Sequence, residues 1–279
     1  MSVLCRFRPA LLLAAIAAAA PVAFGADPAP APAKPAPATP AAPSGFSDRL
    51  FLSFSQDAAM VKSQWWEGRL EYANGKNSDP NVLLMRGVVA FRPIKNLEVG
   101  GSFGFGTASA SPPDPDGTGA TDLDAYGKWV FKDAVPNTDF TVGLLITIPT
   151  GDNTAGLGFD SFSSQVFGGV RRRLENVVLG GHIGLRLNGD GHFQTTDLQG
   201  KTSFEMAFSA LFPLANQVSL VAEAQVETAR FENFDAATQI LGGINWRAFG
   251  RGMLRGAVSV GLTDGSPDFR VLAGYAYTF

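Results

Sequence analysis

The sequence predicts an all-β protein, a transmembrane, antiparallel, up-and-down β-barrel of about 12 strands. Three observations predict this fold. Apolar and polar residues alternate with a period of two from residue 64 to the C-terminus, short connections alternate with longer ones, and the last strand ends on an aromatic residue, Phe279. Alternation alone also fits a soluble β-sandwich, so the connections and the aromatic residues must distinguish the two folds.

The N-terminus, residues 1–25, has the layout of a secretory signal peptide. Arg6 and Arg8 precede an uninterrupted apolar run, residues 11–20, and small residues close the segment at Gly25. The run is shorter than the ~20 residues that a membrane-spanning helix requires. Its removal takes away the only cysteine and lowers the basic count from 22 to 20, against 25 acidic residues. The mature chain therefore has no thiol chemistry, and its charge argues against nucleic acid as a partner.

Three further segments complete the expected organisation. Residues 26–45 are rich in Ala and Pro. This composition favours extended conformations without a core, so we expect a periplasmic linker. Residues 46–63 fit either a short helix or a strand, and we expect this N-terminal segment to pack on or in the mouth of the barrel. Residues 64–279 form the barrel itself.

The barrel segment divides into strands of about 10 residues, the length that a tilted transmembrane strand requires. We expect strands at residues 65–72, 83–92, 97–105, 122–132, 140–148, 161–171, 177–188, 203–212, 218–227, 239–247, 254–262 and 269–279. Long or polar connections are expected at residues 74–81, 107–120, 151–160, 189–201, 228–236 and 263–268. The remaining connections are short. This matches external loops and periplasmic turns, and an even number of strands places both termini in the periplasm.

Large aromatic residues fall near the predicted strand ends on the apolar face. They are Trp66, Tyr72, Phe91, Phe105, Trp129, Phe131, Phe140, Phe212, Trp246, Tyr277 and Phe279. Aromatic girdles at the two membrane interfaces produce this distribution, so we expect outer-membrane lipid to surround the barrel.

Two turn motifs carry a family resemblance. Ile148-Pro149-Thr150-Gly151-Asp152 follows a strand, and Thr263-Asp264-Gly265-Ser266-Pro267-Asp268-Phe269 precedes the last one. With these motifs the chain resembles the bacterial outer-membrane β-barrel family named for the MetA pathway of phenol degradation, whose members are described as transporters. The resemblance implies an outer-membrane barrel proposed to admit small organic compounds, and it carries over no catalytic residues. The terminal Phe279 also resembles the closing residue of outer-membrane barrels, which implies recognition by the barrel assembly machinery.

The smaller, more polar face of the strands is expected to line the lumen. Its predicted pore-lining residues are Glu67, Arg69, Arg86, Glu98, Asp122, Asp124, Lys128, Arg171, His182, Arg186, Glu205, Glu223, Arg247, Arg255 and Arg270. These charges must be solvated or paired, so they form either a salt-bridge network that supports the barrel or a narrow pore for small solutes. The mixture of signs argues against a strong ion filter and favours weakly selective, passive uptake or efflux. A structural or adhesin-like barrel that acts through its external loops is the alternative.

A barrel lipid hydrolase requires a serine beside a histidine. The chain has two histidines, His182 and His192, and the residues two positions after them are Gly184 and Gln194 rather than serine. We therefore predict no catalytic residues. Two separated histidines and no mature cysteine also predict no metal site and no cofactor.

Overall fold

The structure is a computed structural model that describes residues 57–76, 80–109, 116–215 and 217–279. The expected signal peptide, the linker and residues 46–56 of the N-terminal segment lie outside the described residues. The chain divides into two compact units, Met1–Ala42 and Pro43–Phe279, and every described residue belongs to the second. No helix in the described ranges is long and apolar enough to cross a membrane.

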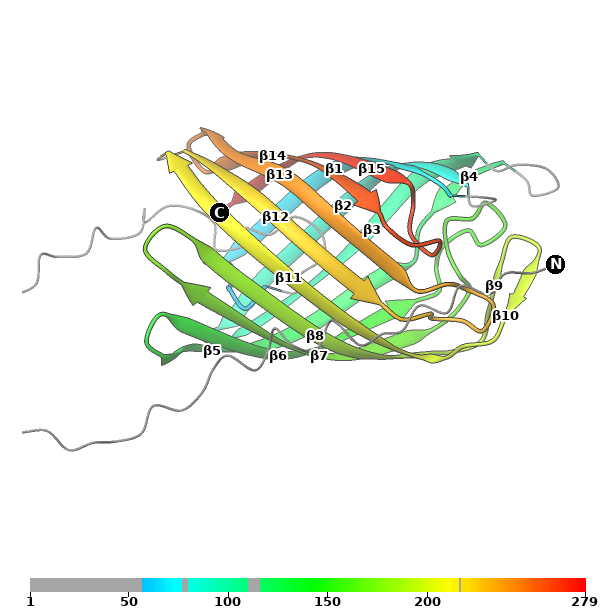
Figure 1. The fold of residues 1–279 in the computed structure, drawn as a ribbon, viewed down its shortest axis with the longest axis horizontal. Coiled ribbons are helices and arrows are strands. Elements are labelled where there is room, and N and C mark those ends of the chain that lie inside the picture. The colour runs from blue at the N-terminus through cyan, green and yellow to red at the C-terminus, as the bar shows by residue number, and fades with distance from the viewer. Residues whose placement is uncertain (1–56, 77–79, 110–115, 216) are drawn as a thin grey trace, which may run out of the picture. The chain divides into compact units, whose positions relative to one another are not determined.

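Twelve antiparallel strands close into a barrel, which confirms the predicted fold class (Figure 1). They are β1 (Gln64–Asn74), β2 (Asn81–Ile94), β3 (Leu97–Ser109), β5 (Leu123–Val135), β6 (Thr138–Ile148), β7 (Ser163–Arg173), β8 (Val178–Asn188), β11 (Thr202–Ala215), β12 (Val218–Glu227), β13 (Ala237–Phe249), β14 (Gly252–Gly261) and β15 (Phe269–Thr278). Each of the twelve predicted segments overlaps one of these strands, because period-two alternation is a direct consequence of strand geometry.

The first and last strands close the barrel. β1 pairs with β15 in a register that places Trp66 opposite Tyr277. The N–H of Phe279 donates to the carbonyl of Gln64 at 3.2 Å, and the Ser63 hydroxyl donates to the carbonyl of Phe279 at 2.9 Å. The predicted pairing of the last strand with the first is therefore confirmed, and closure removes the exposed strand edges of an open sheet.

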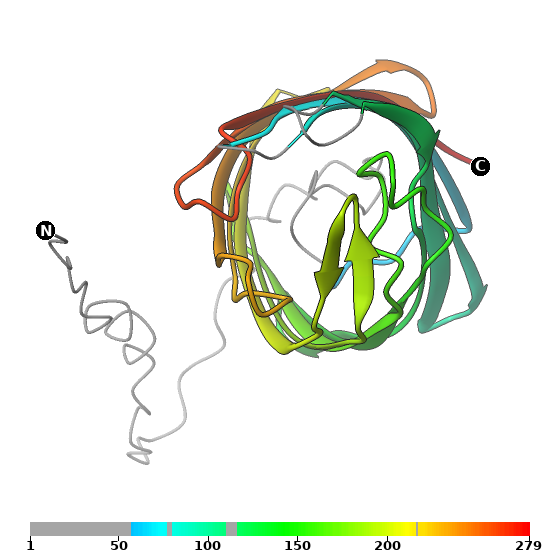
Figure 2. The ribbon, with the colours of Figure 1, turned by 90° about the vertical axis from the view of Figure 1, so that its right-hand side faces the viewer.

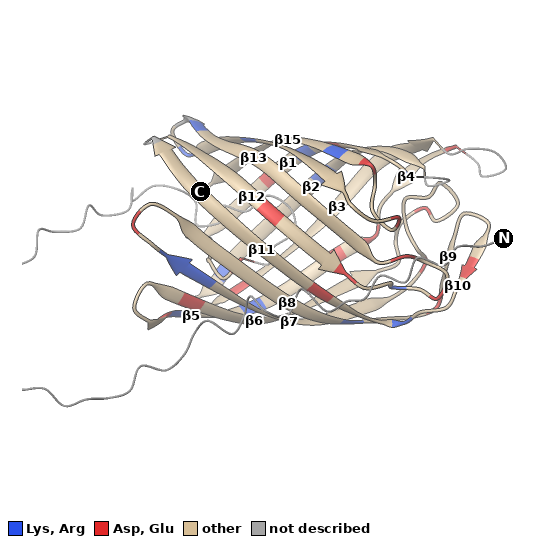
Figure 3. Ribbon diagram, viewed as in Figure 1, with Lys and Arg blue, Asp and Glu red and all other residues tan. Residues whose placement is uncertain are grey.

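The two faces of the wall have opposite character. On β1, Trp66 is 51% exposed and Leu70 is 55% exposed, whereas the inward Trp65 and Glu67 are 1% and 4% exposed. The same distribution recurs around the wall, and charged residues occur along the strands as well as at their ends (Figure 3). An apolar outside and a polar inside are the reverse of a soluble sandwich, so the barrel fits an apolar surrounding such as lipid.

Outward aromatic side chains form two belts. One belt lies at the end of the barrel that carries the short turns and includes Trp66, Phe91, Trp129, Phe131, Phe140, Phe212, Trp246 and Phe279. The other lies at the long-loop end and includes Tyr72, Phe105, Phe162, Phe204 and Phe269. Two belts of amphipathic or aromatic rings are typical of the two membrane interfaces.

Three short strands lie in connections that the sequence predicts to be loops. β4 (Gly117–Ala120) pairs with β3, and β9 (Gly191–Phe193) pairs with β10 (Thr196–Leu198) as a hairpin at the long-loop end (Figure 2). These strands have three or four residues, too few for alternation to reveal them. The predicted long connections are present, and the structure adds these short strands within them.

Candidate functional site: the barrel interior

The predicted pore-lining residues are buried or half-buried. The buried ones are Glu67, Glu98, Lys128, Arg171, His182, Glu205, Glu223 and Arg255. The half-buried ones are Arg69, Arg86, Asp122, Asp124, Arg186, Arg247 and Arg270. Asp122 stands just before β5, where its carboxylate accepts hydrogen bonds from the N–H groups of Gly151 at 2.9 Å and Phe159 at 3.1 Å and so anchors the loop 151–160. That these residues line a path for solutes remains a prediction.

Residues 57–61, here called the inner segment, lie inside the barrel at its short-turn end. Met60 and Val61 are 0% and 1% exposed. Val61 belongs to a buried cluster that contains inward side chains from β1, β2, β5, β6, β7, β14 and β15. A segment that shares one cluster with seven strands of the wall must occupy the interior, and the chain therefore enters its own barrel before it begins β1.

Lys128 on β5 holds the backbone of the inner segment. Its Nζ donates to the carbonyls of Asp57 and Ala59, at 2.6 Å each, and lies 3.3 Å from the carboxylate of Glu98. Hydrogen bonds from a charged donor are about twice as strong as neutral ones. The lysine thus compensates a buried carboxylate and fastens the segment with the same ammonium group.

Glu98 and Arg171 complete this attachment. Glu98 on β3 accepts hydrogen bonds from the Val61 N–H at 2.7 Å and the Tyr126 hydroxyl at 2.8 Å. Arg171 on β7 pairs with the Asp57 carboxylate at 3.3 Å. Because removal of one partner from a buried ion pair leaves an uncompensated charge, each of these contacts favours the inward position of the segment.

A second cluster of charges joins β1 to β14. Arg255 donates to Glu67 at 2.6 Å and to the Asn245 side chain at 3.2 Å, and its guanidinium lies 5.8 Å from the Trp65 ring centre. Arg69 donates to the other oxygen of Glu67 at 2.5 Å. One carboxylate between two guanidinium groups explains how a fully buried acid remains compensated.

Arg86 extends the charged surface towards β5. It lies 3.7 Å from Glu71 and 3.8 Å from Asp124. Asp124 also accepts hydrogen bonds from Ser102 at 3.3 Å and Thr147 at 2.7 Å. Arg86 and Asp124 are half-buried, so they are paired but retain contact with solvent, whereas Glu71 is buried.

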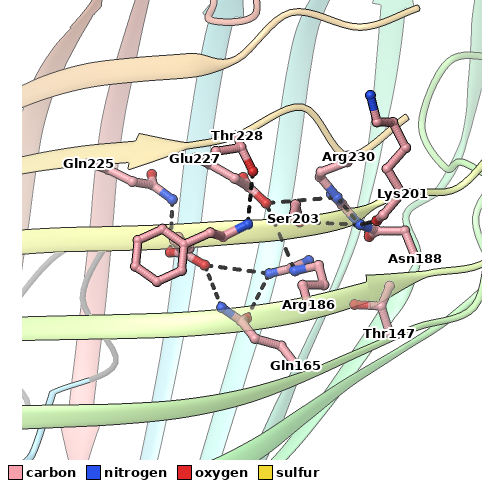
Figure 4. A network of polar contacts seen from close by, with 12 residues as sticks. Thr147, Gln165, Arg186, Asn188, Lys201, Ser203, Gln225, Glu227, Thr228 and Arg230 are labelled. Carbon is pink, nitrogen blue, oxygen red and sulfur yellow. Dashed lines mark hydrogen bonds and ion pairs between the residues drawn. The ribbon is translucent and has the colours of Figure 1, made fainter. Parts of the chain in front are cut away.

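A third network centres on Arg186 (Figure 4). Arg186 donates to the Gln165 carbonyl at 2.9 Å, and the amide groups of Gln165 and Gln225 donate to Glu205 at 2.7 and 2.8 Å. The network connects β7, β8, β11 and β12 through side chains of both signs. Such pairing is what the salt-bridge interpretation of the lumen predicts, and the same groups would line a water-filled path.

The network continues to the long-loop end. The Nε atoms of Arg186 and Arg230 each lie 3.9 Å from Glu227 Oε1, and Arg230 Nε donates to Asn188 at 3.3 Å (Figure 4). Burial lowers the pKa of Arg230 to about 10, so this loop guanidinium remains cationic at neutral pH. Glu227 therefore lies between two cations where the lumen meets the external loops.

The two histidines lie in different surroundings. His182 is buried on β8, with its ring 5.8 Å from Phe167 and 3.8 Å from Glu205. Neither of its ring nitrogens has a hydrogen-bond partner among the described residues. His192 lies in the β9–β10 hairpin, 2.8 Å from Asp197. Within the described ranges, neither histidine is hydrogen-bonded to a serine, and no group of three metal-ligating side chains occurs.

Several interior groups are absent from the predicted set. These groups are Glu71, Gln165, Gln225 and Glu227. Each occupies an inward-facing position in the period-two alternation of its strand, as the predicted residues do, so the alternation was sufficient to find them. For the inner segment the sequence gave only the general expectation that residues 46–63 pack on or in the mouth of the barrel, because a segment without alternation does not reveal which strands it will contact.

The comparison with known families supports the fold and the sequence motifs. Residues 47–279 match the model of the family described as "Putative MetA-pathway of phenol degradation". The chain belongs to this family. The family resemblance predicted from the turn motifs is thus confirmed. No curated protein sequence matches the chain.

This family member also resembles solved outer-membrane structures. An outer membrane channel from Pseudomonas putida F1 has a TM-score of 0.66 and 14% identity, with 81% of this chain and 99% of that chain covered. The NanC porin has a TM-score of 0.55 and 7% identity, with 77% of this chain and 100% of that chain covered. The KdgM porin in complex with disordered oligogalacturonate has a TM-score of 0.52 and 8% identity, with 77% and 99% covered. At these identities the likeness concerns the fold, which is that of outer-membrane channels.

Proposed function

We propose that this protein is an outer-membrane channel through which small organic solutes pass passively, in uptake or efflux, along a narrow and weakly selective path. The observation that carries the proposal is a closed barrel whose interior is lined by paired polar groups and holds a short segment of its own chain. The short turns and both termini face the periplasm in this proposal. The family description, which refers to phenol degradation, supports small organic compounds as solutes.

The mixed charge of the interior supports weak selectivity. Arg255 is paired with Glu67, Arg186 with Glu205, and Lys128 with Glu98. A strong ion filter uses a ring of one sign, whereas here each of these three cations has a carboxylate beside it. Neutral solutes meet no strong electrostatic barrier in such a lumen.

The inner segment makes this conformation a closed one. It occupies the short-turn end, so the passage of solutes requires the segment to leave its site. The attachment consists of the contacts made by Lys128, Glu98 and Arg171, together with the burial of Met60 and Val61. Burial of each of these two apolar side chains contributes about 1.5–3 kcal/mol. Together with the charge-assisted hydrogen bonds of Lys128, this burial keeps the segment bound for most of the time.

Planar-bilayer conductance and liposome swelling test the channel. We expect the full-length protein to conduct weakly and intermittently, and a variant with residues 57–61 replaced by a Gly-Ser linker to conduct more strongly and to admit small sugars faster. Slower migration of boiled than of unboiled protein on a gel verifies that both barrels are folded. Absence of conductance and of solute flux in both folded proteins would refute the proposal.

A further inference from the structure

A cavity of about 350 Å³ lies at the long-loop end of the barrel. Its walls come from the loop 151–160, the β9–β10 hairpin, the loop 228–236 and the loop 263–268, together with the adjoining ends of β1, β2, β12 and β13. Figure 2 shows the hairpin at this mouth of the barrel. An engineered cavity of about 150 Å³ is sufficient to hold benzene, so this vestibule cavity has room for one substituted aromatic ring.

Four phenylalanine rings from three connections form one side of the vestibule cavity. Phe159 stacks on Phe193 with ring centres 5.2 Å apart, and it lies 5.4 Å from Phe231 and 6.3 Å from Phe234. Phe231 is 1% exposed, whereas the other three rings are half-buried. Rings at these distances adopt stacked and edge-to-face arrangements that can accept a further planar ring.

The charged groups that line the vestibule cavity carry both signs, with the guanidinium of Arg230 and the carboxylates of Glu227 and Asp235. Arg230 lies over the rings of Phe159 and Phe231 at 5.3 and 5.9 Å, and it approaches Glu227 at 3.9 Å. An anionic ligand would face the carboxylate of Glu227, and a cationic ligand would face the guanidinium of Arg230. Both would meet a like charge, so the arrangement favours a neutral ligand.

Two oxygen atoms of the cavity residues need a hydrogen-bond donor. Glu227 Oε1 and Gln239 Oε1 are buried and have no hydrogen-bond partner among the described residues. Buried polar atoms in native proteins are almost always satisfied by protein, water or ligand. A hydroxyl group supplies one donor and can also accept from the nearby guanidinium, whereas a hydrocarbon or a carboxylate supplies no donor.

We propose that the vestibule cavity binds a neutral, single-ring aromatic compound that carries a hydroxyl group. The ring lies against Phe159, Phe193 and Phe234, and the hydroxyl donates to Glu227 or Gln239 and accepts from Arg230. The site rests on the proposed function in one respect, since it stands at the outer entrance of the proposed channel. It would concentrate such compounds where the polar network of Arg186 begins.

Calorimetric titration of the full-length protein in detergent tests the site, with empty micelles as the blank. The probes are phenol and benzyl alcohol, compared with toluene, benzoate, benzylamine and cyclohexylmethanol. We expect both aromatic alcohols to bind at least about fivefold more tightly than each of the other probes, since a neutral hydrogen bond and a ring contact each contribute about 1 kcal/mol. Equal binding of toluene and benzyl alcohol would overturn the proposed ligand class.

Three variants locate the binding. We expect Phe193→Ala to weaken the binding of benzyl alcohol about fivefold to tenfold. We expect Glu227→Leu to weaken it about twofold to tenfold and to leave the binding of toluene unchanged. Phe162→Ala is the matched control, because Phe162 is 53% exposed on the outer surface and does not line the cavity. If Phe193→Ala does not fold, Phe234→Leu removes a ring from the same wall and retains an apolar side chain.

Binding that is unaffected by the cavity variants, or affected equally by Phe162→Ala, would refute this site. The result is independent of transport. Binding without conductance or solute flux in either folded protein, full-length or with residues 57–61 replaced, would support the site and refute the channel, whereas flux without binding would support the channel and refute the site.

Discussion

Substitution of Lys128 by methionine should release the inner segment. The side chain keeps most of its volume but loses the ammonium, which donates to the carbonyls of Asp57 and Ala59 at 2.6 Å each. With about 1.5 kcal/mol for each charge-assisted hydrogen bond, the loss is about 3 kcal/mol. This changes the equilibrium between the released and bound segment by about two orders of magnitude.

The rest of the attachment limits the effect. Glu98 still accepts hydrogen bonds from Val61 and Tyr126 after the substitution, and Met60 remains buried. The segment should therefore remain bound for most of the time while opening much more often. We expect a folded barrel with an increased open probability rather than a permanently open pore.

Cysteine labelling measures the released fraction directly. The only cysteine of the chain lies at position 5, within the expected signal peptide, so an Ala58→Cys variant of the mature protein has a single thiol. Ala58 is 1% exposed. A membrane-impermeant maleimide should label it about 100-fold faster in the Lys128→Met background, because modification requires the opened state.

Lys132→Met is the matched control, because Lys132 lies on the same strand and is exposed. It should change neither the labelling rate nor the conductance. Equal labelling rates in the Lys128→Met and Lys132→Met proteins would refute the role of Lys128 in holding the segment.

Three further predictions concern the wall and its closure. Arg255→Met should destabilise the barrel by about 3 kcal/mol in urea unfolding from liposomes, because it removes one of the two guanidinium groups that compensate the buried Glu67 and leaves Arg69 as the other; an unchanged midpoint would contradict the importance of the Arg255–Glu67 pair. Gly143→Ala should lower the free energy of unfolding by about 1–3 kcal/mol, since its added Cβ would overlap a neighbouring ring and a backbone carbonyl. The control Gly68→Ala has open space around the added Cβ and should leave the stability unchanged. Equal effects of the two substitutions would refute the packing argument. Phe279→Ala should reduce insertion into the outer membrane of cells and leave refolding in detergent nearly unchanged, and equal losses in both assays would show that the residue acts through barrel stability instead.

The sequence was sufficient to predict the wall of the barrel. The features that predict the wall are local, because each depends on one strand or one turn at a time. They are the period-two alternation around Trp66 and Leu70, the alternation of short and long connections, and the position of Phe279. A closed barrel in an apolar surrounding permits few other arrangements of these elements, since each backbone group must be paired and each apolar side chain must face outward. The number of strands, their order and the closing pair follow from these local features.

Contacts across the interior depended on the tertiary structure. Arg255 and Glu67 are separated by 188 residues, and Phe159, Phe193 and Phe231 reach one cavity from three connections. Which inward residues meet depends on the tilt and stagger of the strands, which a period of two does not encode. The inner segment is the clearest case, because its enclosure results from the charges and apolar groups of other strands. The sequence by itself therefore determined the fold and the polarity of each face, and only the tertiary structure decided what lies inside.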